Sequence, residues 1–156
     1  MDVQLPGWDE ATLAVMTILS AEAWEVHAEL WHDAASGLSP DVSARLEGAS
    51  LIEKEETAAA WERGRTWCFG LNRLFDEAEV IALPTLADEP PDIDDAGRIG
   101  EIRYVAPFNL AGVPAISLPV RSTGRVPPSL QLVGPAGSEE LLVATAEMIE
   151  STSGFS

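Results

Sequence analysis

Apolar residues in the first part of the chain recur with the period of an α-helix. From Asp9 to about Asp33 they return every three or four positions, which places them on one helical face. Asp9 can cap the start of this helix, and Gly37 with Pro40 interrupts the pattern after its end. We therefore expect a helix over residues 9–33 whose buried stripe is formed by Leu13, Met16, Leu19, Ala23, Val26 and Leu30.

Two further helices follow before the pattern changes. The first is short, over residues 40–47, and the second is long, from about residue 50 to residue 77. The acidic run at 53–56 of the long helix should be solvated. The remaining apolar residues predict its buried stripe, which comprises Trp61, Trp67, Phe69, Leu71, Leu74 and Phe75.

Beyond residue 79 the pattern favours strands. Short apolar runs at 79–84, 115–120 and 129–135 predict three strands covered on both faces, and a final helix begins at Ser138. An acidic, proline-containing connection spans 86–107. Three strands are few for a closed core, so the sheet should be part of a larger one.

The segment FNLAGVPAISLPV, residues 108–120, combines this strand with residues that restrict the backbone. Asn109 stands at its entrance, and Gly112 with Pro114 should shape a turn before the strand. The segment has almost no reactive side chain, so its glycine and prolines indicate that a particular backbone conformation is required there.

The order of elements predicts an α/β fold in a single domain, residues 1–156. We expect a helical part at 9–77, a strand-rich part at 79–135 and a C-terminal helix at 138–151.

Composition and charge limit the partners. Apolar residues make up 46% of the 156 residues, as in a globular protein, and the formal net charge is −17. Such a charge repels nucleic acid and anionic membranes. No apolar run reaches the roughly 18–20 residues that span a bilayer, and the N-terminus is acidic where a signal peptide is basic. We expect a soluble cytoplasmic protein.

The C-terminal motifs resemble those of a known family. EVIALPT, PFNLAGVPAISLPV, SLQLVGP and SEELLVATAEMIE have the order and approximate spacing of the C-terminal half of amidase-signature enzymes. Upstream, Glu22, Ala23 and His27 resemble the family's "EA...H" helix. The resemblance covers nearly the whole chain and implies the C-terminal part of the amidase-signature fold, in which mixed sheet strands are flanked by helices.

The resemblance also implies a missing catalytic centre. The family's chemistry uses an attacking serine, a second serine in a cis peptide and a neutral lysine base, together with backbone N–H groups for the oxyanion. Here there is no Ser-Ser pair and no Gly/Ser-rich loop, and Lys54, the single lysine, lies in a solvated acidic run. We expect no catalytic residue in this chain.

Other candidate reactive groups favour structural roles. His27 and His32 point about 140° apart on one helix and form no metal pair; we expect one packed and one exposed. Cys68, the single cysteine, should be an inert buried thiol and excludes an intramolecular disulfide. The acidic residues of 88–101 lack the spacing of a calcium loop; they are Asp88, Glu89, Asp92, Asp94, Asp95 and Glu101. We expect no metal and no cofactor.

By resemblance, the substrate-binding residues are Thr85, Tyr104, Phe108 and Asn109, which would line a pocket whose reacting groups come from elsewhere. A purely structural duty is the alternative for each.

Two functions remain open. In the first, the chain is the C-terminal segment of a carboxamide hydrolase, inactive alone, and binds a small-molecule amide only when an N-terminal amidase half complements it. In the second, it is a non-catalytic relic that acts in binding or assembly. Both imply association, either with such a half or as a homo-oligomer, because unpaired strand edges associate.

Overall fold

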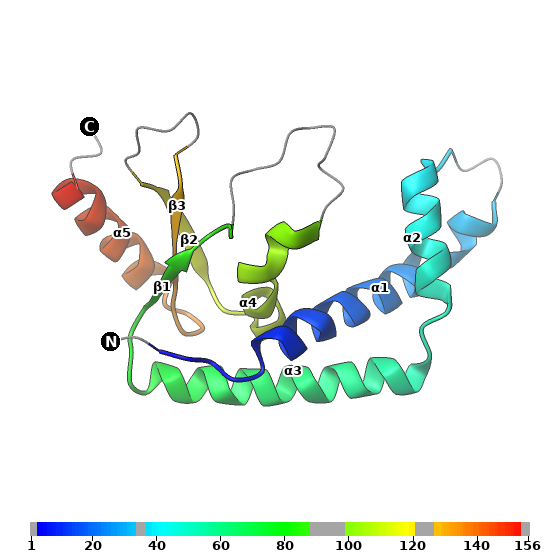
Figure 1. The fold of residues 1–156 in the computed structure, drawn as a ribbon, viewed down its shortest axis with the longest axis horizontal. Helices are drawn as coiled ribbons and strands as arrows, with labels where there is room; N and C mark the ends of the chain where they lie inside the picture. Colours follow the sequence, from blue (N-terminus) through cyan, green and yellow to red (C-terminus); the bar gives the residue numbers. More distant parts are fainter. Residues whose placement is uncertain (1–2, 34–36, 88–98, 121–126, 154–156) are drawn as a thin grey trace.

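The computed structural model describes residues 3–33, 37–87, 99–120 and 127–153. Three helices come first: α1 (Trp8–His32), α2 (Pro40–Ser50) and α3 (Lys54–Phe75). A short strand, β1 (Ile81–Pro84), precedes the 3-10 helix η2 (Ile99–Tyr104) and the helix α4 (Ala106–Ala111). The chain continues through β2 (Ala115–Pro119), β3 (Ser129–Val133) and α5 (Glu139–Ser153). Figure 1 shows α2 near one end of the long α1–α3 layer and the sheet with α5 at the other.

The predicted helices and strands are confirmed to within a few residues at most ends, with one exception. The connection predicted for 86–107 contains η2 in its described part, and Ala106–Ala111, expected as connection and entrance to the strand, form helix α4. Pro107, in the first turn of α4, favours helix because its φ is already fixed there. Gly112 then ends α4 in the left-handed conformation, with φ 64°, which confirms the predicted turn before β2.

The sheet has the strand order β1-β3-β2, and both pairings are antiparallel. The register aligns Ile81 with Val133 in one pair and Ala115 with Val133 in the other. In the described part of the chain, β1 and β2 are therefore both edge strands, each with one free side.

Each face of the sheet packs on its own hydrophobic cluster. On one face, Ile81 and Val133 join Trp67, Leu71 and Phe108. On the opposite face, Leu118 and Leu132 pack against Leu142 and Ala146 of α5. The sheet is thus a middle layer between α5 and the α1–α3–α4 side.

The prediction that all three strands are covered on both faces is wrong for β1 and β2. Exposure alternates along both, whereas Gln131, Leu132 and Val133 of β3 are buried in succession. The exposed residues of β1 and those of β2 lie on opposite faces of the sheet, so neither hydrophobic cluster extends over all three strands. Ala115 and Ser117 of β2 remain exposed.

The buried stripe predicted for the first helix is also wrong. Leu13, Leu19 and Val26 of α1 are exposed by 67%, 60% and 73% of their surfaces. The residues that α1 buries are small or lie on another face, namely Ala11, Ala14 and Ile18. Small side chains let α1 approach α3 and α4 closely. Of the predicted α3 stripe, Trp67 and Leu71 are buried, and Trp61 and Phe69 are exposed.

Candidate functional site

A cluster of polar groups lies on the sheet face toward α4, at the middle of β2 and β3 and just after β1. Thr85 follows β1 and Ser117 lies on β2, and their hydroxyl oxygens are 2.7 Å apart in a hydrogen bond. The register places Gln131 of β3 opposite Ser117. Gln131 is 4% exposed, and its Nε2 donates a 2.9 Å bond to the carbonyl oxygen of Tyr104. We call Thr85, Ser117, Gln131 and the Tyr104 carbonyl the sheet cluster.

The segment that carries Tyr104 is held by side chains from distant elements. Trp8 Nε1 donates to the carbonyl of Arg103 at 2.9 Å, and Trp67 Nε1 donates to the carbonyl of Pro107 at 2.7 Å. The guanidinium of Arg103 also pairs with Asp9 at 3.1 Å. The position of residues 103–107 over the sheet therefore depends on donors from α1, α3 and β3.

The four residues predicted to line a pocket lie in different environments. Thr85 and Tyr104 are half-buried and belong to the sheet cluster, Tyr104 through its backbone. Phe108 is 2% exposed and packs edge-on against Trp8, with ring centroids 5.4 Å apart. Asn109 is exposed on α4. Whether they contact a substrate stays a prediction.

Gln131 is the functional candidate that sequence reasoning missed. The available signal was a lone amide inside the apolar strand SLQLV. A buried amide must find partners, and here the partner is the backbone near the predicted pocket.

The other candidate groups take structural positions. Cys68 is half-buried, and burial raises the pKa of its thiol, as an inert cysteine requires. The prediction that one histidine is packed is wrong, because His27 and His32 are both exposed. The ring of His32 contacts Trp31 edge-on at 5.0 Å between centroids. Residues 88–98 of the acidic segment lie outside the described residues. Among the residues that are described, no three His, Cys, Asp or Glu side chains gather as a metal site requires.

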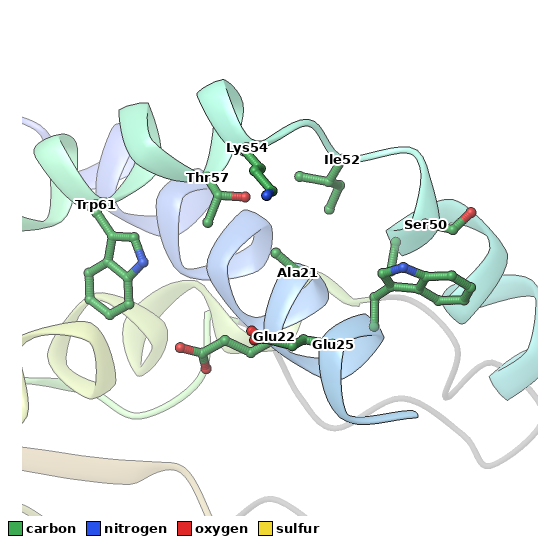
Figure 2. Close-up of a pocket in the computed structure, with 10 residues that line it drawn as sticks. Ala21, Glu22, Glu25, Ser50, Ile52, Lys54, Thr57 and Trp61 are labelled. Atoms are coloured by element: carbon green, nitrogen blue, oxygen red, sulfur yellow. The ribbon is translucent and has the colours of Figure 1, made fainter. Parts of the chain in front are cut away.

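Two cavities lie at the other end of the molecule, away from the sheet cluster. One, of about 610 Å³, is lined by α1, by α3, by the end of α2 and by Ile52 between α2 and α3. Figure 2 shows Lys54 and Thr57 above Glu22 and Glu25, with Trp61 at one end. The second, of about 420 Å³, lies between α1 and α2 and includes Leu19, Leu46 and Ile52. Neither is lined by the four predicted pocket residues. We take the sheet cluster as the candidate functional site, because its buried amide, Gln131, is bonded to the backbone of Tyr104.

None of the described helices has both the length and the apolar character to cross a membrane.

Comparisons with known proteins agree over nearly the whole chain. A family model described as Amidase matches residues 4–143. AmiD of Mycobacterium tuberculosis is 25% identical over 138 residues, which cover 83% of this chain and 29% of AmiD. A second mycobacterial amidase, AmiA2 of the same organism, is 36% identical over 93 residues, which cover 53% of this chain and 19% of AmiA2.

Solved structures show the same fold. An amidase crystal structure superposes with a TM-score of 0.86 at 24% identity, covering 97% of this chain and 37% of that one. A bacterial aryl acylamidase of the amidase-signature family gives 0.78 at 16% identity, covering 98% and 36%. The chain thus spans about a third of these proteins.

With α/β architecture, motifs and family model in agreement, the chain is a member of the amidase-signature family.

Proposed function

We propose that the chain is the C-terminal, substrate-facing segment of an amidase-signature hydrolase that cleaves the C–N bond of carboxamides. It contributes sheet and pocket scaffold, while a second segment supplies the attacking serine, the cis-peptide serine and the lysine. On this proposal the 156 residues form one unit of a larger domain, act in the cytoplasm, and alone have no amidase activity.

The observation that carries the proposal is the open edge of β2 beside the sheet cluster. In an antiparallel pair, successive residues alternately direct their backbone groups toward the partner strand and away from it. The bond from Val120 N–H to the Pro128 carbonyl shows which residues of β2 face β3. Backbone groups of Ala115, Ser117 and Pro119 therefore point away from β3, and the side chains of all three are exposed. Such an edge can pair with an added strand.

The edge of β1 offers less. The bond from Thr85 N–H to the Ser129 carbonyl directs Ala82 and Pro84 outward, so only Ala82 has an outward N–H to donate. On β2 both Ala115 and Ser117 have one, while Pro119, like Pro84, has none. An added strand is therefore expected on β2, where it would meet Ser117 and lie next to the cluster.

In the completed enzyme, the sheet cluster would position the substrate rather than react with it. The hydroxyls of Thr85 and Ser117 can donate to, or accept from, the amide of a substrate. Gln131 would act as a positioning residue by holding the Tyr104 backbone. The oxyanion donors and the nucleophile would come from the second segment.

The test is complementation. The chain is co-expressed with the part of AmiD that lies outside the matched region, the pair is purified through a tag on this chain, and hydrolysis of an aryl amide is measured. We expect turnover from the pair and none from either piece. If the two pieces associate but show no turnover, and sequencing confirms that the AmiD segment has its serines and lysine, the non-catalytic assembly function is favoured.

The matched pair of variants for this assay is Ser117→Ala and Ser129→Ala. Ser117 lies in the sheet cluster, whereas Ser129 begins β3 and is half-buried. A substrate-positioning role predicts that Ser117→Ala raises KM more than Ser129→Ala does. Equal KM values would contradict that role.

A further inference from the structure

Helix α1 carries an apolar stripe that this chain leaves largely uncovered. It consists of Met16, Leu19, Ala23, Val26 and Leu30, which we call the α1 stripe. Leu19, Val26 and Leu30 are exposed by 60%, 73% and 43% of their surfaces. Large apolar side chains so exposed along one line mark an interaction surface.

The spacing of the α1 stripe matches helix packing. Its members are separated by three, four, three and four residues, the spacing with which one helix packs along another. At about 100° per residue they fall within an arc of about 80°. No Asp or Glu of α1 lies within that arc, although the sequence contains 26 acidic residues.

The α1 stripe forms one wall of a groove. The cavity of about 420 Å³ between α1 and α2 is lined by Met16, Leu19 and Ala23 on one side. Leu46 and Ile52 line the other side, together with Arg45. A concave, mostly apolar groove beside an apolar helix face suits the apolar face of another helix.

Charge decides between two occupants. A second copy would bring together two chains that each carry a formal charge of −17, and this repulsion opposes association. A different polypeptide with basic residues beside its apolar helix face would instead be attracted. The chain spans 29% of AmiD and 37% of an amidase of known structure, so the remaining part of a family member is a different polypeptide, to which the repulsion between two copies of this chain does not apply.

We propose that the α1 stripe, with the groove beside it, is the docking surface for an apolar helix of the remaining part of an amidase-signature enzyme. The proposal rests on the proposed function and adds a second contact to it, at the opposite end of the molecule from the β2 edge. The helix docks along α1, and the two contacts together fix the orientation of the catalytic segment on the sheet.

The experiment compares Leu19→Glu with Met148→Glu in the full chain. Both residues are 60% exposed on helices, but Met148 lies on α5, far along the chain from the stripe. The probe is the part of AmiD outside the matched region, co-expressed and then titrated in solution. We expect Leu19→Glu to weaken binding about tenfold or more, because one desolvated apolar anchor can dominate an interface. Met148→Glu should bind as the unmodified chain does.

Each outcome is informative. If both variants bind within twofold of the unmodified chain while all have the same circular dichroism and melting temperature, the docking surface is wrong and the proposed function stands. If the unmodified chain neither binds nor activates the AmiD segment, the proposed function fails and this proposal with it. If ultracentrifugation shows a dimer that Leu19→Glu dissociates, the occupant is a second copy and the proposal is overturned.

Discussion

The indole Nε1 of Trp67 on α3 donates a buried 2.7 Å hydrogen bond to the carbonyl of Pro107 on α4. The two residues are 40 positions apart, and the bond joins the long helix to the segment that covers the sheet. Phe108, the next residue, is buried in the same cluster. The position of Tyr104 over the sheet therefore depends on a donor outside the strand-rich part.

Replacement of Trp67 by phenylalanine tests this link. Trp67→Phe keeps an aromatic ring in the core but leaves the Pro107 carbonyl without its donor. We expect a loss of about 1–3 kcal/mol in the free energy of unfolding from the unpaired carbonyl. Trp61→Phe is the control, since Trp61 is 42% exposed and should change stability by less than about 0.5 kcal/mol. Urea unfolding followed by circular dichroism measures both, and equal effects would contradict the importance of the bond.

Gln131 offers a second test with a natural control. Gln131→Met keeps the length of the side chain but removes the donor to Tyr104, so we expect a loss of about 1–3 kcal/mol. Gln4, the other glutamine, is exposed, and Gln4→Met should be neutral. Urea unfolding of the two variants decides the matter: a neutral Gln131→Met would mean that the buried amide does not hold the segment.

Gly112 and Gly48 should respond in opposite directions to the same substitution. Gly112 has φ 64°, which an alanine adopts only at a cost, so Gly112→Ala should destabilise by about 1 kcal/mol. Gly48 lies inside α2 with open space at its Cβ, so Gly48→Ala should stabilise by about 0.5–1 kcal/mol. Thermal melts with the same sign for both would contradict the assignment of Gly112 as the end of α4.

Cys68 should react slowly with thiol reagents. Burial raises the pKa of its thiol, so the thiolate fraction at pH 7–8 is smaller than for a free cysteine. We expect the rate of modification by a chromogenic disulfide to stay low through this range and to rise only at higher pH. The comparison is the same measurement in urea, where a faster reaction is expected. Rapid modification of the folded chain at pH 7 would contradict an inert thiol.

The periodic patterns located the elements well because spacing and breakers are local properties. The α1 and α3 helices, the three strands and the turn at Gly112 all follow from them. The patterns could not say which apolar face is covered. Leu19 and Val26 have the spacing of core residues, yet 60% and 73% of their surfaces are exposed among the residues that the structure describes.

The candidate site was only partly predictable for a different reason. Thr85 was identified through family resemblance, but its partner Ser117 is 32 residues away and becomes visible only when the strand register is known. The helix α4 was missed because FNLAGV is too short for periodicity to identify it as helix. Its stability comes from contacts such as the bond to Trp67.

The most direct measurement is the hydrolysis of an aryl amide by the purified 156-residue chain alone, at an enzyme concentration high enough to detect a few turnovers per hour. We expect no release of amine above the buffer blank, because the chain has no Ser-Ser pair and its single lysine is exposed on α3. Turnover that persists through a second purification route would contradict it, since a nucleophile and base would then have to reside in this chain.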